Sequence, residues 1–259
     1  MKDLTAKILH HAPLKAGYWT LTLDAKEIAD SAVPGQFVHI RIPSLEPSAL
    51  RRPFSIFGAR GGQLHILYKT VGRGTEKMNA LNAGDTVTVM GPLGNGFPLT
   101  PTGIPLLVAG GYGVAPLCFL AEHLPCKGIV FIGGRTADDI LAYEQFEQLG
   151  WTVHIATQDG SQGETGLVTL PLDREIARLK ADGQHVELYA CGPDGMLKAV
   201  GQRAIDNNAQ GWLSLDKHMV CGVGACLACV QKLLTPDTPP RLVCVCRDGP
   251  VFNAHDIIW

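Results

Sequence analysis

The sequence contains no long uninterrupted hydrophobic run. None of its 259 residues belongs to a stretch that approaches the roughly 18 apolar residues that a membrane-spanning helix needs. The first residues, MKDLTAKILHHAP, carry charges and histidines where a secretory signal would have an apolar core. We therefore expect no membrane association and a cytoplasmic location.

The sequence also lacks a strong net charge. It has 22 basic and 24 acidic residues, a formal net charge of −2, so no overall field favours nucleic acid or anionic lipid as a partner. Its 9 histidines show no metal-ligand spacing. The 46% of apolar residues are enough for more than one packed core, and the length allows two or three domains.

Cysteine, by contrast, is concentrated near the C-terminus. The 8 cysteines, in a chain with no export signal, indicate reduced thiols and a metal centre rather than a disulfide framework. Cys221, Cys226 and Cys229 have the spacing C-x4-C-x2-C, and Cys244 and Cys246 follow. A triple followed by a distant cysteine is typical of a plant-type [2Fe–2S] cluster. A structural zinc site is the alternative, although its thiolates usually come as two C-x2-C pairs.

The identity of the fourth ligand stays open from spacing alone. The segment Leu242-Val243-Cys244-Val245-Cys246 alternates as a strand does, which predicts that both cysteines face the same side. Small uncharged residues separate the first three cysteines, so the loop can curl and bring backbone N–H groups to the sulfurs. Cys118 and Cys126 are interpreted as small core residues.

Two other segments precede the cysteine-rich region. Residues 1–99 contain short candidate strands between Gly and Pro turns, which predicts an antiparallel β-barrel. Residues 100–211 alternate strands and helices, one of them over Asp138–Leu149, which predicts a Rossmann-like α/β domain with a parallel sheet. Residues 212–259 are too few to fold by apolar burial alone, so a metal centre would have to stabilise them. The predicted fold class is therefore multidomain β plus α/β with a small C-terminal cluster domain.

Two motifs in the first segment suit a flavin. The first supplies a guanidinium for a phosphate, a ring to cover the flavin and a hydroxyl for its edge, and consists of Arg52, Pro53, Phe54 and Ser55. Taken alone, it is also compatible with a solvated arginine beside a turn proline. In the second, the strand end Leu67-Tyr68-Lys69 is followed by Gly72-Arg73-Gly74-Thr75, whose backbone N–H groups can face an anion. Arg52 and Gly74-Thr75 are thus two candidate phosphate contacts.

Two glycine-containing turns in the second segment suit a nucleotide. The strand Leu106–Ala109 is followed by Gly110-Gly111-Tyr112-Gly113-Val114, a glycine turn that opens a helix, although the spacing is not GxGxxG. A later strand ends in Cys191-Gly192-Pro193, at the carboxyl edge of the sheet, where ligands of open α/β sheets bind. Any strand-to-helix turn could have the first pattern, so it is a candidate pyrophosphate site and no more.

Taken in order, these motifs resemble the ferredoxin-reductase superfamily. RPFS, LYK, GRGT and GPLGNGF resemble its FAD domain, and GGYGVAPL with CGPDGML resembles its NAD(P) domain. With CGVGACLACV and CRDGPVF, the chain is most similar to the electron-transfer subunits of class B dihydroorotate dehydrogenases. The resemblance implies three cofactors: FAD, a [2Fe–2S] cluster and NAD(H). It further implies that Cys246, directly before Arg-Asp-Gly-Pro, is the fourth ligand, and that the nicotinamide site is lined by Gly110, Gly111, Gly113, Val114, Cys191, Gly192 and Pro193.

The resemblance also implies a division of labour between two subunits. Oxidation of dihydroorotate to orotate at FMN would occur on a separate catalytic subunit, joined with this chain in a heterotetramer of two plus two. This chain would then carry electrons to NAD⁺ in pyrimidine biosynthesis, and it shows no acid/base set of its own for a carbon substrate. One departure is that the family usually has an acidic residue where Lys217 or His218 stands before Met219.

Two other interpretations remain. The chain could serve another complex, such as a sulfide dehydrogenase or an NADPH–ferredoxin reductase, or it could be a zinc-bound scaffold with an inactive reductase fold. Arg135 could meet the 2′-phosphate of NADPH, but the neighbouring Asp138 and Asp139 favour NADH.

Overall fold

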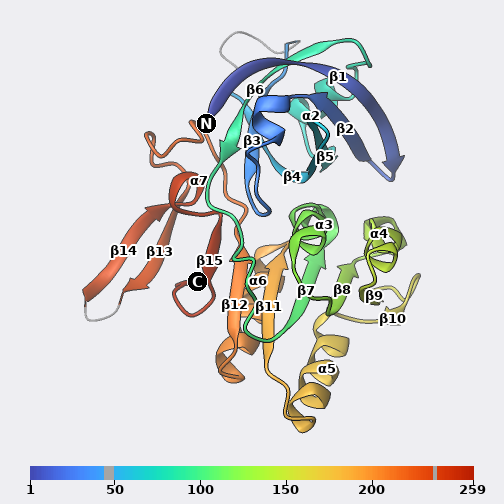
Figure 1. Cartoon of the computed structure of the whole chain (residues 1–259), viewed down its shortest axis with the longest axis vertical. Coiled ribbons are helices and arrows are strands. Elements are labelled where there is room, and N and C mark those ends of the chain that lie inside the picture. Colours follow the sequence, from blue (N-terminus) through green and yellow to red (C-terminus); the bar gives the residue numbers. More distant parts are fainter. Residues whose placement is uncertain (44–49, 236–237) are drawn as a thin grey trace.

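The N-terminal part of the chain is a closed antiparallel barrel, drawn at the top of Figure 1. The computed structural model describes residues 1–43, 50–235 and 238–259. The strand order of the barrel is β1-β2-β5-β4-β3-β6. The strands are β1 (Lys2–Lys15), β2 (Tyr18–Asp24), β3 (Phe37–Arg41), β4 (Arg52–Arg60), β5 (Gln63–Lys69) and β6 (Thr86–Leu93), and the helices beside them are α1 (Lys26–Ala29) and α2 (Arg73–Met78). The predicted barrel is confirmed.

Strand β3 is buried on both of its faces. Val38 and Ile40 enter the barrel core, as the two-residue period of a strand predicts. Phe37 points the other way and belongs to a core outside the barrel, which it shares with residues of the C-terminal segment. The His39 ring lies beside it, with the two ring centroids 5.7 Å apart. One wall of the barrel is therefore packed against the rest of the molecule.

Below the barrel in Figure 1 lies a seven-stranded sheet of order β10-β9-β8-β7-β11-β12-β15. All neighbouring strands are parallel except β12 and β15. Leu106 and Val108 face one core, and Leu107 and Ala109 face another, so both sides of the sheet are covered. The strands are β7 (Ile104–Gly110), β8 (Ile129–Gly134), β9 (Thr152–Thr157), β10 (Glu164–Thr165), β11 (Val186–Cys191), β12 (Gln210–Ser214) and β15 (Val251–Asn253). The predicted parallel-sheet domain is confirmed.

Helices cover the two faces of this sheet. On one side, α3 (Val114–His123) also packs against β4 of the barrel, and its Phe119 side chain belongs to the barrel core. The helix α4 (Tyr143–Gln148) shares this side, whereas α5 (Thr169–Ala181) and α6 (Asp194–Asp206) pack on the other. Helix α3 thus connects the two main parts of the molecule. No helix among residues 1–43, 50–235 and 238–259 is long and apolar enough to cross a membrane.

The predicted helix over Asp138–Leu149 is wrong, because the segment is broken in its middle. A short 3-10 turn, η2 (Ala137–Asp139), is followed by an extended Ile140, and α4 begins only after Ala142, whose φ is +56°. The Asp139 carboxylate accepts a hydrogen bond from the Arg135 amide, 3.2 Å away, which turns the chain back on itself. Burial of Ile140 and Leu141 then holds the break in place.

The C-terminal segment forms a hairpin of β13 (Val230–Thr235) and β14 (Thr238–Cys244), followed by the short helix α7 (Val245–Asp248). The expectation that Cys244 and Cys246 share one strand face is wrong, because β14 ends at Cys244 and Cys246 lies in α7. The hairpin joins the main core through Leu233 and Val243. Strand β12 continues across the predicted domain boundary at 211/212, since Trp212 and Leu213 pair with β11.

Candidate functional site

A first cavity, of about 640 Å³, lies between the barrel and the C-terminal segment. The predicted flavin residues that line it are Arg52, Pro53, Phe54, Ser55, Leu67, Tyr68, Lys69 and Thr75. On the opposite side it is bounded by Cys191 of the sheet and by Leu215–Val220, which lead directly into Cys221. We call this space the flavin cavity. The fold therefore gathers the two predicted flavin motifs in one place, although they come from separate strands.

The two predicted phosphate contacts, Arg52 and Gly74, pack closely against each other. A Cβ atom on Gly74 would lie only 2.7 Å from Nε of Arg52, so a larger residue would displace the guanidinium. Thr75 fixes the turn before α2, because its Oγ1 accepts hydrogen bonds from the amides of Val71 (2.9 Å) and Gly72 (3.2 Å). The predicted phosphate contacts thus form a cradle of one cation and a tight glycine turn.

A second cavity, of about 770 Å³, lies at the carboxyl edge of the sheet. Four of the predicted nucleotide residues line it, namely Gly110, Gly111, Gly192 and Pro193. We call it the nucleotide cavity. Gly113 and Val114 lie behind its wall: both are buried, and a Cβ on Gly113 would lie 2.3 Å from the Cys191 carbonyl oxygen. These two residues shape the turn, and Cys191 lines the flavin cavity instead.

The two cavities share a border formed by Lys69, Val71, Tyr112 and Asp216–His218. The Tyr112 hydroxyl donates to the Asp216 carboxylate, 3.2 Å away. Burial, followed by the nearby Asp216, raises the pKa of Tyr112 to about 12, so this hydroxyl stays protonated at neutral pH. Sequence reasoning did not assign a role to Tyr112 or Asp216, although the position of Tyr112 inside the glycine turn was a usable signal.

A second polar cluster joins the barrel to the sheet beside this border. Lys69 Nζ lies 3.0 Å from Asp139 Oδ1 and 3.1 Å from the Tyr18 hydroxyl, which itself donates to Asp139 at 2.7 Å. Although partial burial opposes ionisation, the hydrogen bonds from Tyr18 and Lys69 lower the pKa of Asp139. The sequence pattern relates Asp139 only to the choice between NADH and NADPH, so this inter-domain role was missed. No local pattern connects it to Tyr18, which is distant in the sequence.

Backbone contacts join four of the five cysteines of the C-terminal segment in two pairs. The Cys226 amide donates to the Cys221 sulfur, and the Cys246 amide donates to the Cys229 sulfur, each at 3.4 Å. Burial opposes ionisation of Cys221, but the amides of Val223 and Cys226 outweigh it and lower the pKa of the Cys221 thiol to about 6. Two pairs of sulfurs fit two iron ions that are each held by two thiolates. Within the ranges that the structure describes, no group of three or more His, Cys, Asp or Glu residues surrounds a single-ion site.

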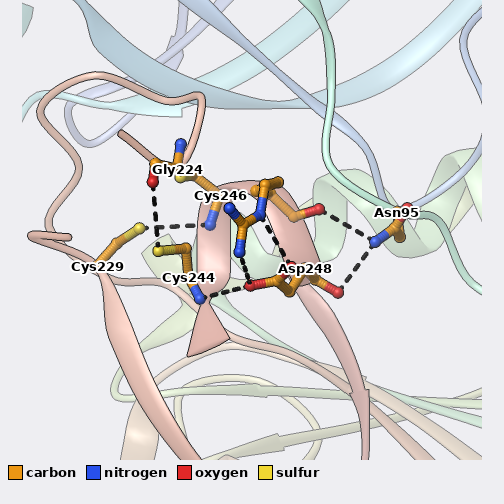
Figure 2. A network of polar contacts seen from close by, with 7 residues as sticks. Asn95, Gly224, Cys229, Cys244, Cys246 and Asp248 are labelled. Atoms are coloured by element: carbon orange, nitrogen blue, oxygen red, sulfur yellow. Dashed lines mark hydrogen bonds and ion pairs between the residues drawn. The ribbon is translucent and has the colours of Figure 1, made fainter. Parts of the chain in front are cut away.

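Cys244 and Cys246 have different surroundings, as Figure 2 shows. The Cys246 sulfur accepts a hydrogen bond from the Gly224 amide at 3.2 Å, and the Cys246 amide donates to the Cys229 sulfur at 3.4 Å. The Cys244 sulfur instead donates to the Gly224 carbonyl at 3.8 Å. Backbone N–H groups directed at a sulfur favour its thiolate form. The geometry therefore suits Cys246 as a ligand better than Cys244.

Asp248 and Asn95 hold α7 in place next to these cysteines (Figure 2). The Cys244 amide donates to the Asp248 carboxylate at 2.7 Å. Asn95, in the glycine-rich segment that leaves the barrel, donates to the backbone carbonyls of Arg247 (3.2 Å) and Asp248 (3.0 Å). The position of Cys246 is thus set from the barrel as well as from its own hairpin.

Comparison with solved structures defines the class of fold. The structure titled "Insights into flavin-based electron bifurcation via the NADH-dependent reduced ferredoxin-NADP oxidoreductase structure" matches with a TM-score of 0.85 and 27% identity, over 98% of this chain and 90% of that one. A ferredoxin NADP⁺ reductase from Neisseria gonorrhoeae shares the fold at a TM-score of 0.65 and 15% identity, over 80% of this chain and 92% of that one. The molecule is an oxidoreductase with a ferredoxin-reductase fold.

Sequence relatives identify the family within this class. The iron–sulfur cluster binding domain of dihydroorotate dehydrogenase B matches residues 216–258, and an oxidoreductase NAD-binding domain matches residues 107–202. The electron transfer subunit of dihydroorotate dehydrogenase B (NAD(+)) from Geobacillus sp. (strain WCH70) is 38% identical over 100% of this chain and 99% of its own length. The corresponding subunit from Bacillus caldolyticus is 41% identical over 93% of this chain and 92% of its own length. The chain therefore belongs to the family of electron transfer subunits of dihydroorotate dehydrogenase B, and the resemblance inferred from its motifs is confirmed.

Proposed function

We propose that this chain carries electrons from a partner dehydrogenase subunit to NAD⁺ through a [2Fe–2S] cluster and FAD. The observation that supports this most directly is the position of the flavin cavity. It borders the nucleotide cavity at Tyr112 and the cysteine loop at Met219 and Val220. Bound FAD exchanges electrons in pairs, as a hydride, with a nicotinamide and singly with an iron–sulfur cluster. Such chemistry requires the flavin to lie between the nicotinamide and the cluster, and the flavin cavity lies between the nucleotide cavity and the cysteine loop.

The proposed contacts of this chain follow from the cavities. Arg52 with Gly74 and Thr75 would bind the phosphates of FAD, and the flavin wall would be Pro53, Phe54, Ser55, Leu67, Tyr68 and Lys69. Gly110, Gly111, Gly192 and Pro193 would admit NAD(H) close to the backbone, while Gly113, Val114 and Cys191 hold the turn. Cys221 and Cys226 would hold one iron, and Cys229 and Cys246 the other. We propose the domain ranges 1–99, 100–211 and 212–259 for these three sites, with β12 shared across the last boundary.

The partner that we propose is an FMN-containing catalytic subunit that oxidises dihydroorotate, in a cytoplasmic heterotetramer of two plus two. Apolar side chains are exposed around the cysteine loop, at Val220 (41%), Val223 (38%) and Leu227 (63%). An apolar patch next to a one-electron centre suits a docking face, because electrons leave such a centre through protein contact. The relatives are named as electron transfer subunits, which supports a partner of this kind.

Reconstitution tests the proposal. The isolated holoprotein should oxidise NADH with an artificial acceptor and should not oxidise dihydroorotate. Addition of an FMN-containing dihydroorotate dehydrogenase subunit should give an assembly that reduces NAD⁺ with dihydroorotate.

A pair of charge substitutions tests the docking face. Leu227→Asp places a charge in the apolar patch and should therefore abolish the coupled reaction. NADH oxidation should stay intact, because Asp tolerates the φ of +57° at this position. Ile205→Asp on α6, at a residue that is 44% exposed, is the matched control and should couple normally. Failure of the wild-type pair to couple, with all cofactors in place, would assign the chain to another complex, such as the reduced ferredoxin-NADP oxidoreductase type that its fold matches.

A further inference from the structure

The side chain of His39 lies between the barrel and the cysteine loop. It projects from the outer face of β3 and is completely buried. Its ring packs against Gly222, the residue after Cys221: a Cβ atom on Gly222 would lie 2.7 Å from Cε1, 2.8 Å from Nδ1 and 3.1 Å from Nε2. The loop approaches the ring this closely because Gly222 has no side chain. The His39 imidazole therefore packs against the residue that directly follows Cys221, a proposed iron ligand.

Neither ring nitrogen of His39 has a hydrogen-bond partner among the residues that the structure describes. Burial of an unpaired N–H group is costly, so such groups usually mark a partner that is not part of the polypeptide. Arg51 Nη1, near the same site, is also buried without a partner in the described part of the chain, although Arg51 Nη2 pairs with Asp3 at 2.9 Å. Two unpaired donors thus occur where the barrel meets the cysteine loop.

The His39 imidazole can donate a hydrogen bond in either protonation state, because both forms carry at least one ring N–H group. Burial, followed by the positive charge of Arg51, lowers the pKa of His39 to about 4. A neutral imidazole carries one N–H group and can donate one hydrogen bond from the ring. It can do so without any proton transfer when the centre beside it takes up an electron.

The geometry directs this donor to the cluster rather than to the flavin. Phe37, two residues earlier on the same face of β3, lines the flavin cavity, whereas His39 does not. The ring of His39 faces the loop residue that follows Cys221. A ligand sulfur or a sulfide at that end of the cluster is a hydrogen-bond acceptor whose negative charge increases on reduction.

We propose that His39 donates a hydrogen bond from its ring N–H to a sulfur of the iron–sulfur centre beside Cys221 and thereby raises the reduction potential of that centre. Hydrogen bonds to cluster sulfurs favour the reduced, more negative state. One electron enters the cluster and no proton moves, so His39 is a positioning residue and not a catalytic one. The proposal rests on the proposed function, since it requires a cluster at the four cysteines.

The test is a redox titration of the purified holoprotein and of its variants, with cluster reduction followed by EPR and FAD reduction followed by absorbance. His39→Phe retains the ring but removes the donor. At a fixed potential we expect it to reduce the ratio of reduced to oxidised cluster about tenfold, which corresponds to a shift of ~59 mV to lower potential for a one-electron couple. The FAD midpoint should stay unchanged. His39→Asn and His39→Gln place amide donors near Nδ1 and Nε2, and one of them should restore the wild-type midpoint.

His65→Phe is the matched control. His65 is also a barrel histidine with a buried unpartnered Nε2 in the described structure, but it lies on β5, where its Nδ1 is 3.2 Å from the Thr22 hydroxyl. The His65→Phe variant should therefore leave the midpoint reduction potential of the cluster unchanged.

The possible outcomes separate this inference from the proposed function. Absence of a [2Fe–2S] signal from the wild-type protein would overturn the function itself. A normal wild-type cluster whose midpoint does not move in His39→Phe, or a shift of the FAD midpoint alone, would overturn the inference only. If His39→Phe fails to assemble the cluster, His39→Leu replaces it. Loss of the cluster in both apolar variants but not in Asn or Gln supports the donor, and loss in all four contradicts it.

Discussion

At the scale of single residues, Gly222 meets two independent demands. Its φ is +72°, in the region where an L side chain costs roughly 1–2 kcal/mol, and a Cβ there would overlap the His39 ring. Gly17 has a similar φ of +81°, but a Cβ at that position meets no described atom within 4 Å. A comparison of substitutions at the two glycines therefore separates the conformational cost of a side chain at positive φ from the cost of its overlap with neighbouring atoms.

We predict that Gly222→Ala loses most of its iron, whereas Gly17→Ala keeps it and is destabilised only by the conformational cost of roughly 1–2 kcal/mol. The overlap with His39 must displace the cysteine loop, because the ring is buried and has no room to retreat. Iron per chain and the free energy of unfolding measure the two effects. Equal iron contents in the two variants would contradict the steric argument.

The choice between Cys244 and Cys246 is also decided at single residues. We predict that Cys246→Ser loses the visible absorption and the EPR signal of the cluster, because the Cys246 amide donates to the Cys229 sulfur and the Cys246 sulfur accepts a hydrogen bond from the Gly224 amide. Cys244→Ser should retain both signals, since a serine hydroxyl can also donate to the Gly224 carbonyl. The reverse result would make Cys244 the fourth ligand.

At the scale of elements, the strands follow from sequence patterns and one helix does not. The expected antiparallel barrel strands are present in residues 1–99, and β7 contains the predicted strand Leu106–Ala109. The segment after β8 has helix-forming residues, yet Asp139 pairs with Lys69 and Tyr18 of the barrel and interrupts it. A contact between elements outweighs the local helix propensity there.

The contact of Asp139 with Lys69 and Tyr18 makes the free energy of unfolding depend on pH. Asp139 has a lowered pKa in the folded chain, so its contribution is complete above the ordinary aspartate value of about 4 and is lost as the pH falls through the lowered value. We predict that Asp139→Asn is destabilised by roughly 1–2 kcal/mol at neutral pH, a modest amount because the pair is partly exposed. This difference from wild type should shrink in acid.

Chemical denaturation of both proteins at a series of pH values measures this difference. Asp24→Asn, at the exposed end of β2, serves as the control and should track the wild type. A difference for Asp139→Asn that grows as the pH falls below about 4 would show that its carboxylate does not stabilise the fold.

At the scale of the whole molecule, the charges around the nucleotide cavity are largely compensated. Lys69 pairs with Asp139 and Lys217 with Asp194, at 3.0 Å and 3.4 Å. Arg135 lies in the same cavity outside these two ion pairs. A 2′-phosphate carries close to two negative charges and is bound well when several cations converge on it.

We therefore predict that the holoprotein prefers NADH to NADPH by tenfold or more in kcat/KM. The compensated lysines attract a second phosphate only weakly, and Arg135 acts alone. Steady-state NADH and NADPH oxidation with an artificial acceptor measures the ratio. Arg135→Ala is a useful comparison and should leave the KM for NADH within a factor of about three. A wild-type preference for NADPH would contradict the prediction.

Features of this protein whose residues lie close together along the chain could be predicted from the amino-acid sequence. The cysteine triple, the glycine turns and the alternation of the strands are local patterns, and their chemistry or periodicity acts over a few residues. They were sufficient to predict the barrel, the parallel sheet, the cluster motif and the family. Cys246 was selected by resemblance, and the hydrogen bonds around it agree with that choice.

Contacts between residues that are distant in the sequence depend on the packing of the whole fold and could not be predicted from the sequence. His39 and Gly222, Tyr18 and Asp139, and Tyr112 and Asp216 each join segments that no sequence period relates. Their contacts arise because the barrel, the sheet and the hairpin bury their apolar faces against one another, and that packing sets the relative positions of the elements. The polar groups at these junctions must then find partners wherever the packing has placed them.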